Sequence, residues 1–243
     1  MACSNYRRIL LLNIAYKILS YILYVRLSEY TERIIDKYQC GFRKGKSTTN
    51  QIFTLSQIME KTVEYQIGVH HLFTDFKSVY DSIYREKRLY AMMGFGVPSK
   101  LIRLVKTTMI NVQCSVQIQS HLSEPISTTR GVRQGDALAC LLCNIALEKV
   151  IRDSGIQTRR TIFFKIVQIL AYADDIDLMA RTITGLNEAF LNLEKSARNM
   201  GSVINQEKKL YMHRGKDTTL HQDLAIGSYM FKSVDNLKYL GTI

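Results

Sequence analysis

The sequence is poor in cysteine and proline, and its acidic side chains are fewer than its basic ones. Five cysteines among 243 residues, without an evenly spaced framework, argue against a disulfide-stapled secreted domain and favour a reducing, intracellular compartment. Two prolines, no internal repeat and no low-complexity tract argue against a long linker. With 47 % hydrophobic and 22 % charged residues, the composition is that of a globular protein and excludes disorder as the main description. The length suits one large domain or two small ones.

A long uninterrupted hydrophobic run is also missing. The apolar stretch 9–25 is broken by Asn13 and Lys17, so its pieces are far shorter than the roughly 20 residues that a membrane-spanning helix needs. No small-residue cleavage site follows it, which argues against a signal peptide. We expect no membrane partner, and predict instead a packed helix over 14–28. Its buried face would be formed by Ile14, Ile18, Leu19, Ile22, Val25 and Leu27.

The positive charge is unevenly distributed. The formal net charge is +12, and residues 1–110 carry 17 basic and 8 acidic side chains against 16 and 13 in residues 111–243. Such a surplus fits a partner that is dense in phosphate, and acidic membranes are the competing interpretation. Charge alone does not choose between them.

Local patterns predict an α+β domain with a largely antiparallel sheet. Helices are expected at 50–65 (capped by Ser47 or Thr48), at 85–109 (broken by Gly94, Gly96 and Pro98), at 134–153 and at 184–200. Strands are expected at 70–76, 112–118 (with Val112, Cys114, Val116 and Ile118 on one half-buried face), 125–129, 162–171, 176–181, 228–232 and 237–241.

Three carboxylates stand at the ends of apolar strands. Asp174 and Asp175 are adjacent between two such strands. Two like charges about 4 Å apart repel by about 4 kcal/mol at an effective dielectric constant near 20. A solvated turn would tolerate the pair, and so would a divalent cation with its preference for oxygen ligands. Asp75 also ends an apolar strand, and two antiparallel strands that present carboxylates at one end would form a site for two Mg²⁺ ions and phosphoryl transfer.

These residues belong to a longer series of blocks that resembles a known family. The sequence resembles the reverse transcriptases of non-LTR (LINE-like) retrotransposons over nearly its whole length. The matching blocks are NYRRILLLN (5–13), QCGFRKGKSTTNQI (39–52), FTDFKSVYDSI (73–83), RGVRQGDAL (130–138), YADD (172–175), GSVINQEKK (201–209) and YLG (239–241). The resemblance implies a fingers–palm polymerase fold, in which helices back an antiparallel palm sheet, and RNA-directed DNA polymerase activity.

The resemblance also implies roles for single residues. Asp75 and Asp174 match the two metal-binding aspartates, and Asp175 matches the supporting carboxylate beside them. The backbone at Phe76 matches a position that helps to hold the metal and the incoming triphosphate. Tyr80 matches the aromatic residue against the sugar of the incoming nucleotide, where its ring would exclude a 2′-hydroxyl; plain core packing is the alternative for this residue.

Further matches concern the nucleotide and the template. Gln134 and Gly135 match the block behind the nucleotide pocket, Arg7 matches a triphosphate-binding arginine, and Lys208 matches a lysine that would protonate the leaving pyrophosphate. Template phosphates would pass along the basic loop that contains Arg43, Lys44 and Lys46. The alternative is that these three residues belong to a solvated loop without a ligand. The implied cofactor is a pair of Mg²⁺ ions, with Mn²⁺ as a substitute, and the implied partners are an RNA template, a DNA primer and a dNTP.

The family pattern suggests partial fingers with the basic loop over 1–70, a palm over 71–215 with a fingers insertion near 97–129, and the end of the palm over 216–243. We expect the thumb to be absent. Some positions depart from the family, notably Ala139 and Cys140 where Ser-Pro is usual, which hints at relaxed constraint. A catalytically silent nucleic-acid-binding remnant or fragment is therefore the alternative function. Integration implies access to the nucleus, although the sequence contains no compelling nuclear signal.

Overall fold

The computed structural model describes residues 10–77, 79–133, 135–156, 167–205, 209–215 and 222–241. The chain divides into two compact units. The first unit comprises Met1–Ile34 and Ser78–Ala146, and the second comprises Ile35–Lys77 and Leu147–Ile243. Within the described ranges, none of the helices combines the length and the apolar character that crossing a membrane requires.

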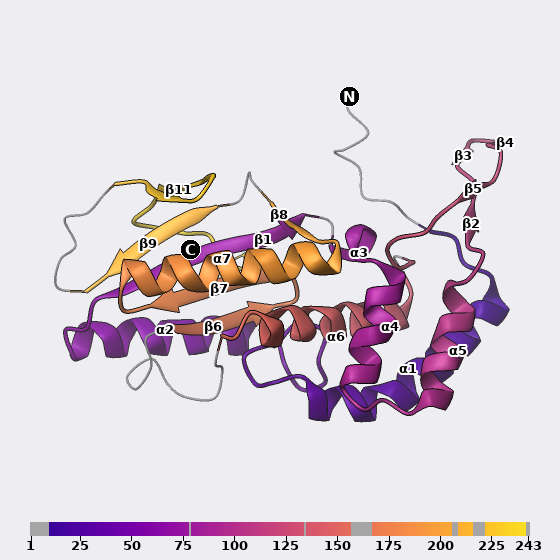
Figure 1. The fold of residues 1–243 in the computed structure, drawn as a ribbon, viewed down its shortest axis with the longest axis horizontal. Helices are drawn as coiled ribbons and strands as arrows, with labels where there is room; N and C mark the ends of the chain where they lie inside the picture. Colours follow the sequence, from indigo (N-terminus) through magenta and orange to yellow (C-terminus); the bar gives the residue numbers. More distant parts are fainter. Residues whose placement is uncertain are drawn as a thin grey trace. The chain divides into compact units, whose positions relative to one another are not determined.

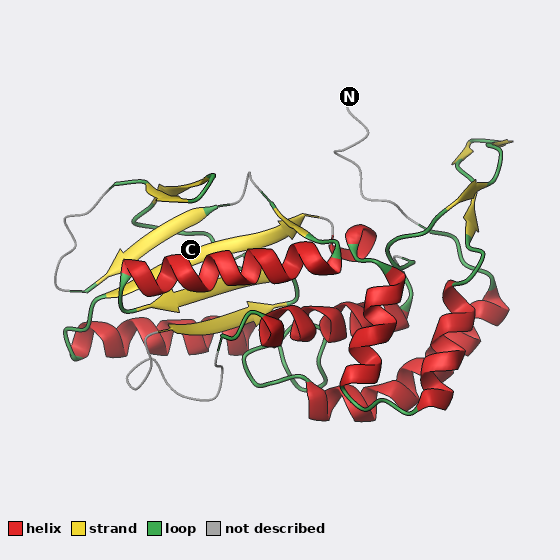
Figure 2. Ribbon diagram, in the orientation of Figure 1, coloured by secondary structure: helices red, strands yellow, loops and turns green. Residues whose placement is uncertain are grey.

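The first unit is mainly helical (Figure 2). Helix α4 packs against α5, and α5 packs against α1. The predicted break near Gly94 and Pro98 is confirmed, because α4 ends at Gly94 and α5 begins at Ser99. The elements are α1 (Ile14–Ile34), α3 (Val79–Ser82), α4 (Arg85–Gly94), α5 (Ser99–Met109), β2 (Gln113–Cys114), β3 (Gln117–Ile118), β4 (His121–Leu122), β5 (Ile126–Ser127) and the first part of α6 (Ala137–Asp153).

Helix α1 begins at Ile14 as predicted, but it continues to Ile34 instead of ending near residue 28, and it buries a different face. The predicted apolar face is wrong except for Leu27, since its other five members are 43–75 % exposed. The buried positions instead follow a helical spacing through Ser20, Leu23, Leu27, Thr31 and Ile34. Apolar residues occur all around this helix, so periodicity alone could not select the face that packs.

The predicted strand 112–118 is interrupted. Val112 is buried, but Val116 and Ile118 are exposed, which contradicts the expected half-buried face. Two short pairings form, β2 with β5 and β3 with β4. Figure 1 shows them as a narrow hairpin that extends beyond the end of α5. The residues of β2, β3, β4 and β5 are exposed apart from the half-buried Cys114, so alternate side chains do not point into a core.

The second unit is built around a mixed sheet in the order β10-β11-β9-β1-β7-β6, with β8 paired to β1. All its pairings are antiparallel except that of β11 with β9, which is parallel. The α+β class with a helix-backed sheet is thereby confirmed. The elements are α2 (Thr48–Glu64), β1 (Val69–Lys77), β6 (Val167–Tyr172), β7 (Asp175–Ala180), α7 (Ile183–Met200), β8 (Val203–Ile204), β9 (Leu210–Arg214), β10 (Leu224–Ile226) and β11 (Tyr229–Ser233), together with the end of α6.

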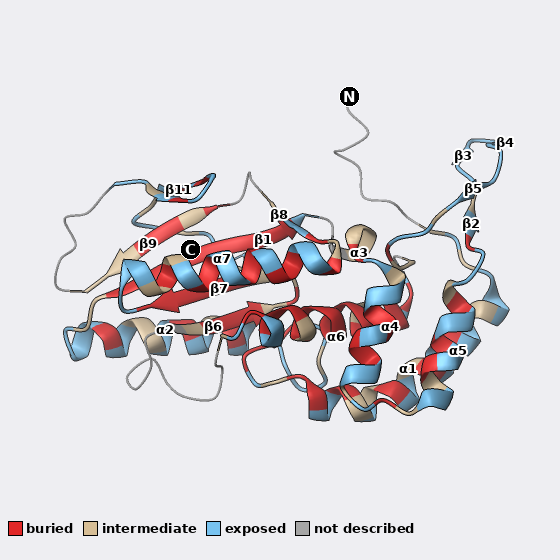
Figure 3. Cartoon of the chain, viewed as in Figure 1, coloured by how far each residue is buried: buried red, intermediate tan, exposed pale blue. Residues whose placement is uncertain are grey.

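Strand β1 is buried on both faces along all but its last residue (Figure 3). Helix α2 covers one face, where Leu55 packs in a cluster with Phe73 and Met179. Helix α7 contacts β1, β6 and β7 and covers the other (Figure 1). Helix α2 forms close to the predicted range 50–65. Of the two predicted caps, Ser47 is the one used, through a reciprocal capping box with Asn50.

The end of the second unit departs from the prediction. Strand β10 was not expected, and in the range 237–241, which was predicted as a strand, Tyr239 makes only an isolated bridge. Instead, the Tyr239 ring packs against Phe73, with ring centroids 5.6 Å apart. Leu237 packs against the same core cluster. Side-chain packing on the face of the sheet, which a local apolar pattern does not reveal, replaces the strand ladder here.

Candidate active site

The register of two central strands brings carboxylates together at one end of the second unit's sheet. β1 and β7 are antiparallel, and their pairing sets Asp75 directly opposite Asp175. Asp174 immediately precedes Asp175, in the two-residue turn that connects β6 to β7. Asp75 is buried, whereas Asp174 and Asp175 are half-buried. The structure thus brings the three carboxylates singled out in the sequence to the same end of the sheet.

The electrostatics of this end favour a cation. Residues directly opposite each other in an antiparallel pair have Cα atoms about 4.5–5.5 Å apart and side chains on the same face. Two like charges in this position repel unless protons or cations neutralise them. The described residues contain no group of three or more His, Cys, Asp or Glu side chains that could hold a metal ion by themselves. The donor set instead fits Mg²⁺, which commonly uses one or two carboxylates and completes its shell with water and phosphate oxygens.

A tyrosine and a buried ion pair lie beside these carboxylates. Burial raises the pKa of Tyr239, and the negative charges of Asp177 and Asp175 add to this effect, while a hydrogen bond from Gln51 opposes it. Asp177 accepts from His71 Nδ1 at 3.0 Å, and both side chains are fully buried. Inside the sheet, a histidine therefore provides a hydrogen-bond partner for the buried carboxylate.

The backbone next to Asp75 is held by β8. The Asp75 carbonyl accepts from the Asn205 amide at 2.8 Å, and Phe76 pairs with Ile204. The Phe76 side chain is buried. The predicted backbone position at Phe76 thus lies beside Asp75 in a strand that is fixed on both edges.

Tyr80 and Gly135 belong to the first unit. Tyr80 is half-buried in α3, and its hydroxyl donates to Cys140 Sγ at 3.9 Å. Gly135 is exposed and has a φ of +93°, a conformation that favours glycine. Next to it, Asp136 Oδ1 caps α6 by accepting from the Leu138 amide at 3.0 Å.

The other carboxylate oxygen of Asp136 connects the start of α6 to α1. It accepts from the Tyr16 hydroxyl at 2.6 Å. Burial, together with this hydrogen bond, raises the pKa of Tyr16 to about 12. Arg7, Gln134 and Lys208, which are predicted to contact the nucleotide or pyrophosphate, lie outside the described residues.

The basic loop is only partly available to a ligand. Arg43 Nη1 donates to the carbonyls of Asp36 at 2.7 Å and Gln39 at 3.0 Å, so this side chain holds its own loop. Lys44 and Lys46 are exposed. The two lysines therefore fit a phosphate track better than Arg43 does.

Sequence reasoning missed Gln39, which contacts the carboxylate-bearing turn. Its amide exchanges hydrogen bonds with the backbone of Ala173, the residue before Asp174. Gln39 belongs to the matching block 39–52, but a glutamine beside a basic loop resembles an ordinary polar loop residue. Only the contact across 134 positions distinguishes it.

Comparisons with known proteins identify the family of the chain. The reverse transcriptase (RNA-dependent DNA polymerase) family model matches residues 2–243. An uncharacterized 149 kDa protein of transposon TX1 from Xenopus laevis is 24 % identical over 191 residues, which are 76 % of this chain and 14 % of that protein. A Pol polyprotein from the type-1 retrotransposable element R2 of Nasonia vitripennis is 23 % identical over 232 residues, which are 91 % of this chain and 22 % of that protein.

Solved structures share the fold at low sequence identity. Telomerase from Candida albicans, solved with a fragment of telomeric RNA, aligns with a TM-score of 0.63 and 13 % identity, over 87 % of this chain and 36 % of that one. The chain spans less than a quarter of the length of the two curated relatives. On the family match, this chain belongs to the reverse transcriptase (RNA-dependent DNA polymerase) family, with relatives among non-LTR retrotransposon proteins of the R2 and TX1 kinds.

Proposed function

We propose that the chain is the polymerase domain of a non-LTR retrotransposon protein, which adds dNTPs to a primer 3′-hydroxyl on an RNA template. The observation that carries this proposal is the register that sets Asp75 opposite Asp175, with Asp174 in the adjoining turn. Family membership supplies the reaction class.

The metal requirement follows from the donor set. Asp75, Asp174 and Asp175, together with the backbone at Phe76, would hold two Mg²⁺ ions, or Mn²⁺ in their place. Ions bound there would stabilise the negative charge on the attacking and leaving oxygens during in-line displacement at the α-phosphate. The protein's own contribution is to hold these carboxylates at the end of a sheet whose central strand is buried on both faces.

The nucleotide would be recognised by residues of the matching blocks. Tyr80 would pack its ring against the sugar and exclude a 2′-hydroxyl. Gly135 and Gln134 would form the pocket wall, Arg7 would bind the triphosphate, and Lys208 would donate a proton to pyrophosphate. Arginine suits the triphosphate because its guanidinium can bind phosphate oxygens in pairs.

The template and primer would bind by charge. Lys44 and Lys46 are exposed on a loop in the part of the sequence with the largest basic surplus. Lysine contacts to phosphates release counterions from the nucleic acid, so such binding weakens steeply with salt.

A second function is a nucleic-acid-binding remnant that does not extend primers. The departures from the family pattern at Ala139 and Cys140, where Ser-Pro is usual, are compatible with a sequence that is no longer selected for polymerase activity.

Primer extension separates the two functions. The chain is incubated with an RNA template, a labelled DNA primer, dNTPs and Mg²⁺. Its binding to the RNA–DNA hybrid of template and primer is measured in parallel. We expect extension by the wild type, none by Asp174→Asn, and unchanged extension by the control Asp153→Asn, whose carboxylate pairs with Lys149 at the surface. Binding without extension by the wild type would support the remnant instead.

Thermal unfolding tests the metal site without requiring turnover. A cation that binds only the folded state stabilises it by RT ln(1 + [L]/Kd). We expect a small rise in Tm with Mg²⁺ alone and a larger one with Mg²⁺ and dNTP, because phosphates complete the coordination. Asp174→Asn should abolish the rise in Tm with Mg²⁺. An equal rise in the variant would contradict the site.

A further inference from the structure

The side-chain amide of Gln39 satisfies both backbone polar groups of Ala173. Its Nε2 donates to the Ala173 carbonyl at 3.0 Å, and its Oε1 accepts from the Ala173 amide at 2.7 Å. The same Oε1 accepts from the Gly41 amide at 2.8 Å. Gln39 is 2 % exposed, so these bonds are made away from solvent. One buried side chain therefore performs the role that a neighbouring strand would perform at this residue.

Ala173 needs such support because of its backbone conformation. Its φ of +55° lies in the left-handed region, which disfavours any residue with a Cβ. Ala173 is also buried, so water cannot satisfy its amide and carbonyl. The next residue is Asp174. The conformation of Ala173 sets the direction in which the chain enters Asp174, and Gln39 stabilises that conformation.

The chain around Gln39 fits closely against the same turn. The Cys40 amide donates to the Ala171 carbonyl at 2.9 Å, and the Ala171 amide donates to the Tyr38 carbonyl at 2.9 Å. A Cβ at Gly41 would lie 2.2 Å from the Ala173 nitrogen, so only glycine allows this approach. Residues 36–43, which we call the brace loop, thus run alongside the end of β6.

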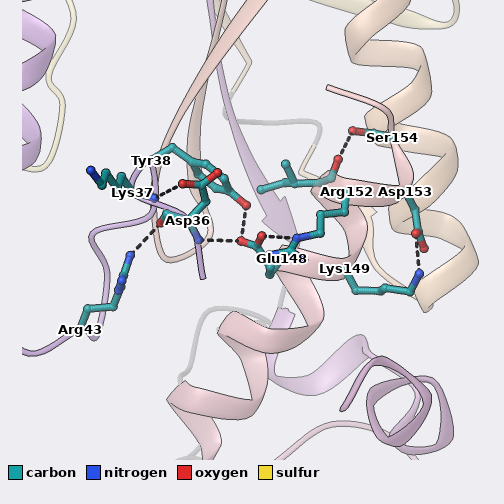
Figure 4. Close-up of polar contacts among 10 residues, drawn as sticks. Asp36, Lys37, Tyr38, Arg43, Glu148, Lys149, Arg152, Asp153 and Ser154 are labelled. Atoms are coloured by element: carbon teal, nitrogen blue, oxygen red, sulfur yellow. Dashed lines mark hydrogen bonds and ion pairs between the residues drawn. The ribbon is translucent and has the colours of Figure 1, made fainter. Parts of the chain in front are cut away.

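The brace loop is itself anchored to helix α6 (Figure 4). The Tyr38 hydroxyl donates to Glu148 Oε2 in α6 at 2.5 Å, and the Asp36 amide donates to the same oxygen at 3.4 Å. Arg152 Nε donates to the other Glu148 oxygen at 2.7 Å. Arg43 adds its bonds to two carbonyls of the loop. The amide of Gln39 is therefore presented to Ala173 from a loop that is fixed to a helix.

We infer that Gln39 is a positioning residue that fixes the Asp174 turn in its metal-binding conformation; this rests on the proposed function. Residues that orient metal ligands without touching the metal typically change metal affinity by about 10–100-fold when they are removed. Without the Gln39 bonds, the Asp174 carboxylate would sample a wider range of positions, and binding of the ion would have to restrict it. The affinity for the metal should fall even where the fold survives.

The test measures Mn²⁺ binding to the whole chain by electron paramagnetic resonance of the free ion. Gln39→Met keeps the length of the side chain but removes its three hydrogen bonds. The matched control is Gln51→Met, because Gln51 is also a buried glutamine of the second unit, and among the described residues its side chain donates a single 3.4 Å bond, to the Tyr239 hydroxyl. A second variant, Gly41→Ala, displaces the same turn by steric contact, and circular dichroism confirms that each variant is folded.

We expect the Kd for Mn²⁺ to rise at least tenfold in Gln39→Met and in Gly41→Ala, and to stay within twofold of the wild-type value in Gln51→Met. Asp174→Asn should no longer bind Mn²⁺. If Asp174→Asn abolishes binding while Gln39→Met and Gly41→Ala bind like the wild type, the positioning role is wrong and the metal site stands. An equal loss in Gln51→Met would also overturn it, by assigning the effect to general destabilisation. If Asp174→Asn binds Mn²⁺ as the wild type does, or the wild type binds none, the metal site fails and this inference fails with it.

Discussion

Arg88 offers the sharpest test of how the first unit is stabilised. Its side chain in α4 is fully buried, and Nε, Nη1 and Nη2 have no hydrogen-bond partner among the described residues. Desolvation lowers the pKa of Arg88; the nearby Cys143 raises it and Arg85 lowers it further. A guanidinium carries five N–H donors, and taking a charged group out of water without a partner costs several kcal/mol even after relaxation.

Arg88→Met should therefore stabilise the protein. Methionine retains an unbranched apolar chain that fills most of the same space and removes the charge. Replacing buried ionic groups by hydrophobic residues of similar volume typically gains about 1–4 kcal/mol, and because Arg88 is unpaired we expect a value near the upper end, about 3 kcal/mol. For a chain of this length, 1 kcal/mol shifts Tm by about 2–4 °C, so the expected rise is about 6–12 °C.

Thermal and urea unfolding of three variants would check this value. Arg103→Met is the control, because Arg103 is exposed in α5 and surface substitutions usually change stability by less than about 0.5 kcal/mol. Arg85→Met should destabilise, since Arg85 donates to the carbonyls of Met109, Thr128 and Gly131. A neutral or destabilising Arg88→Met, with the control unchanged, would refute the argument that the buried guanidinium weakens the fold.

Three further predictions concern charge, pH and sugar choice. Replacing Lys44 and Lys46 by alanine should lower the slope of log Kd against log salt for an RNA–DNA hybrid by about 1 for each lysine that contacts a phosphate, whereas Lys149→Ala should leave it unchanged. Burial, with smaller effects from neighbouring histidines, lowers the pKa of His70 to about 4. As pH falls below about 6.5, the histidine is protonated in the unfolded chain before it is protonated in the folded one. The free energy of unfolding should therefore drop by about 2 kcal/mol between pH 7 and pH 5, and urea titrations of His70→Asn should show a smaller drop. Tyr80→Ala should admit ribonucleotides in primer extension and Tyr80→Phe should not; equal discrimination would return Tyr80 to core packing.

Local signals sufficed where an element is determined by its own residues. Helix α2 was predicted with its cap because Ser47 and Asn50 interact within one turn. The break between α4 and α5 was predicted because glycine and proline act on their own backbone. Where the outcome depends on distant packing, prediction failed. The buried face of α1 and the docking of Tyr239 on the sheet, in place of a strand, were both decided by residues far away in the sequence.

The candidate site shows the same division. The residue types and the block order identified Asp75, Asp174 and Asp175, but only the register of β1 with β7 shows which of them face each other. Arg43 was assigned to the template because it lies in a basic loop that matches the family, whereas its bonds to the carbonyls of Asp36 and Gln39 give it a structural role within that loop. Gln39 was missed because its partner, Ala173, follows 134 positions later.

One face of the sheet carries carboxylates in two electrostatic situations. In an antiparallel pair, every second residue points to the same face, so Asp175 and Asp177 share a face with Asp75. Asp177, the inner one, is fully buried and accepts a hydrogen bond from His71 Nδ1 at 3.0 Å. At the end of the sheet, Asp175 stands opposite Asp75. The same face therefore places one carboxylate beside a histidine in its interior and brings two carboxylates together at its end, where the proposed cation would bind.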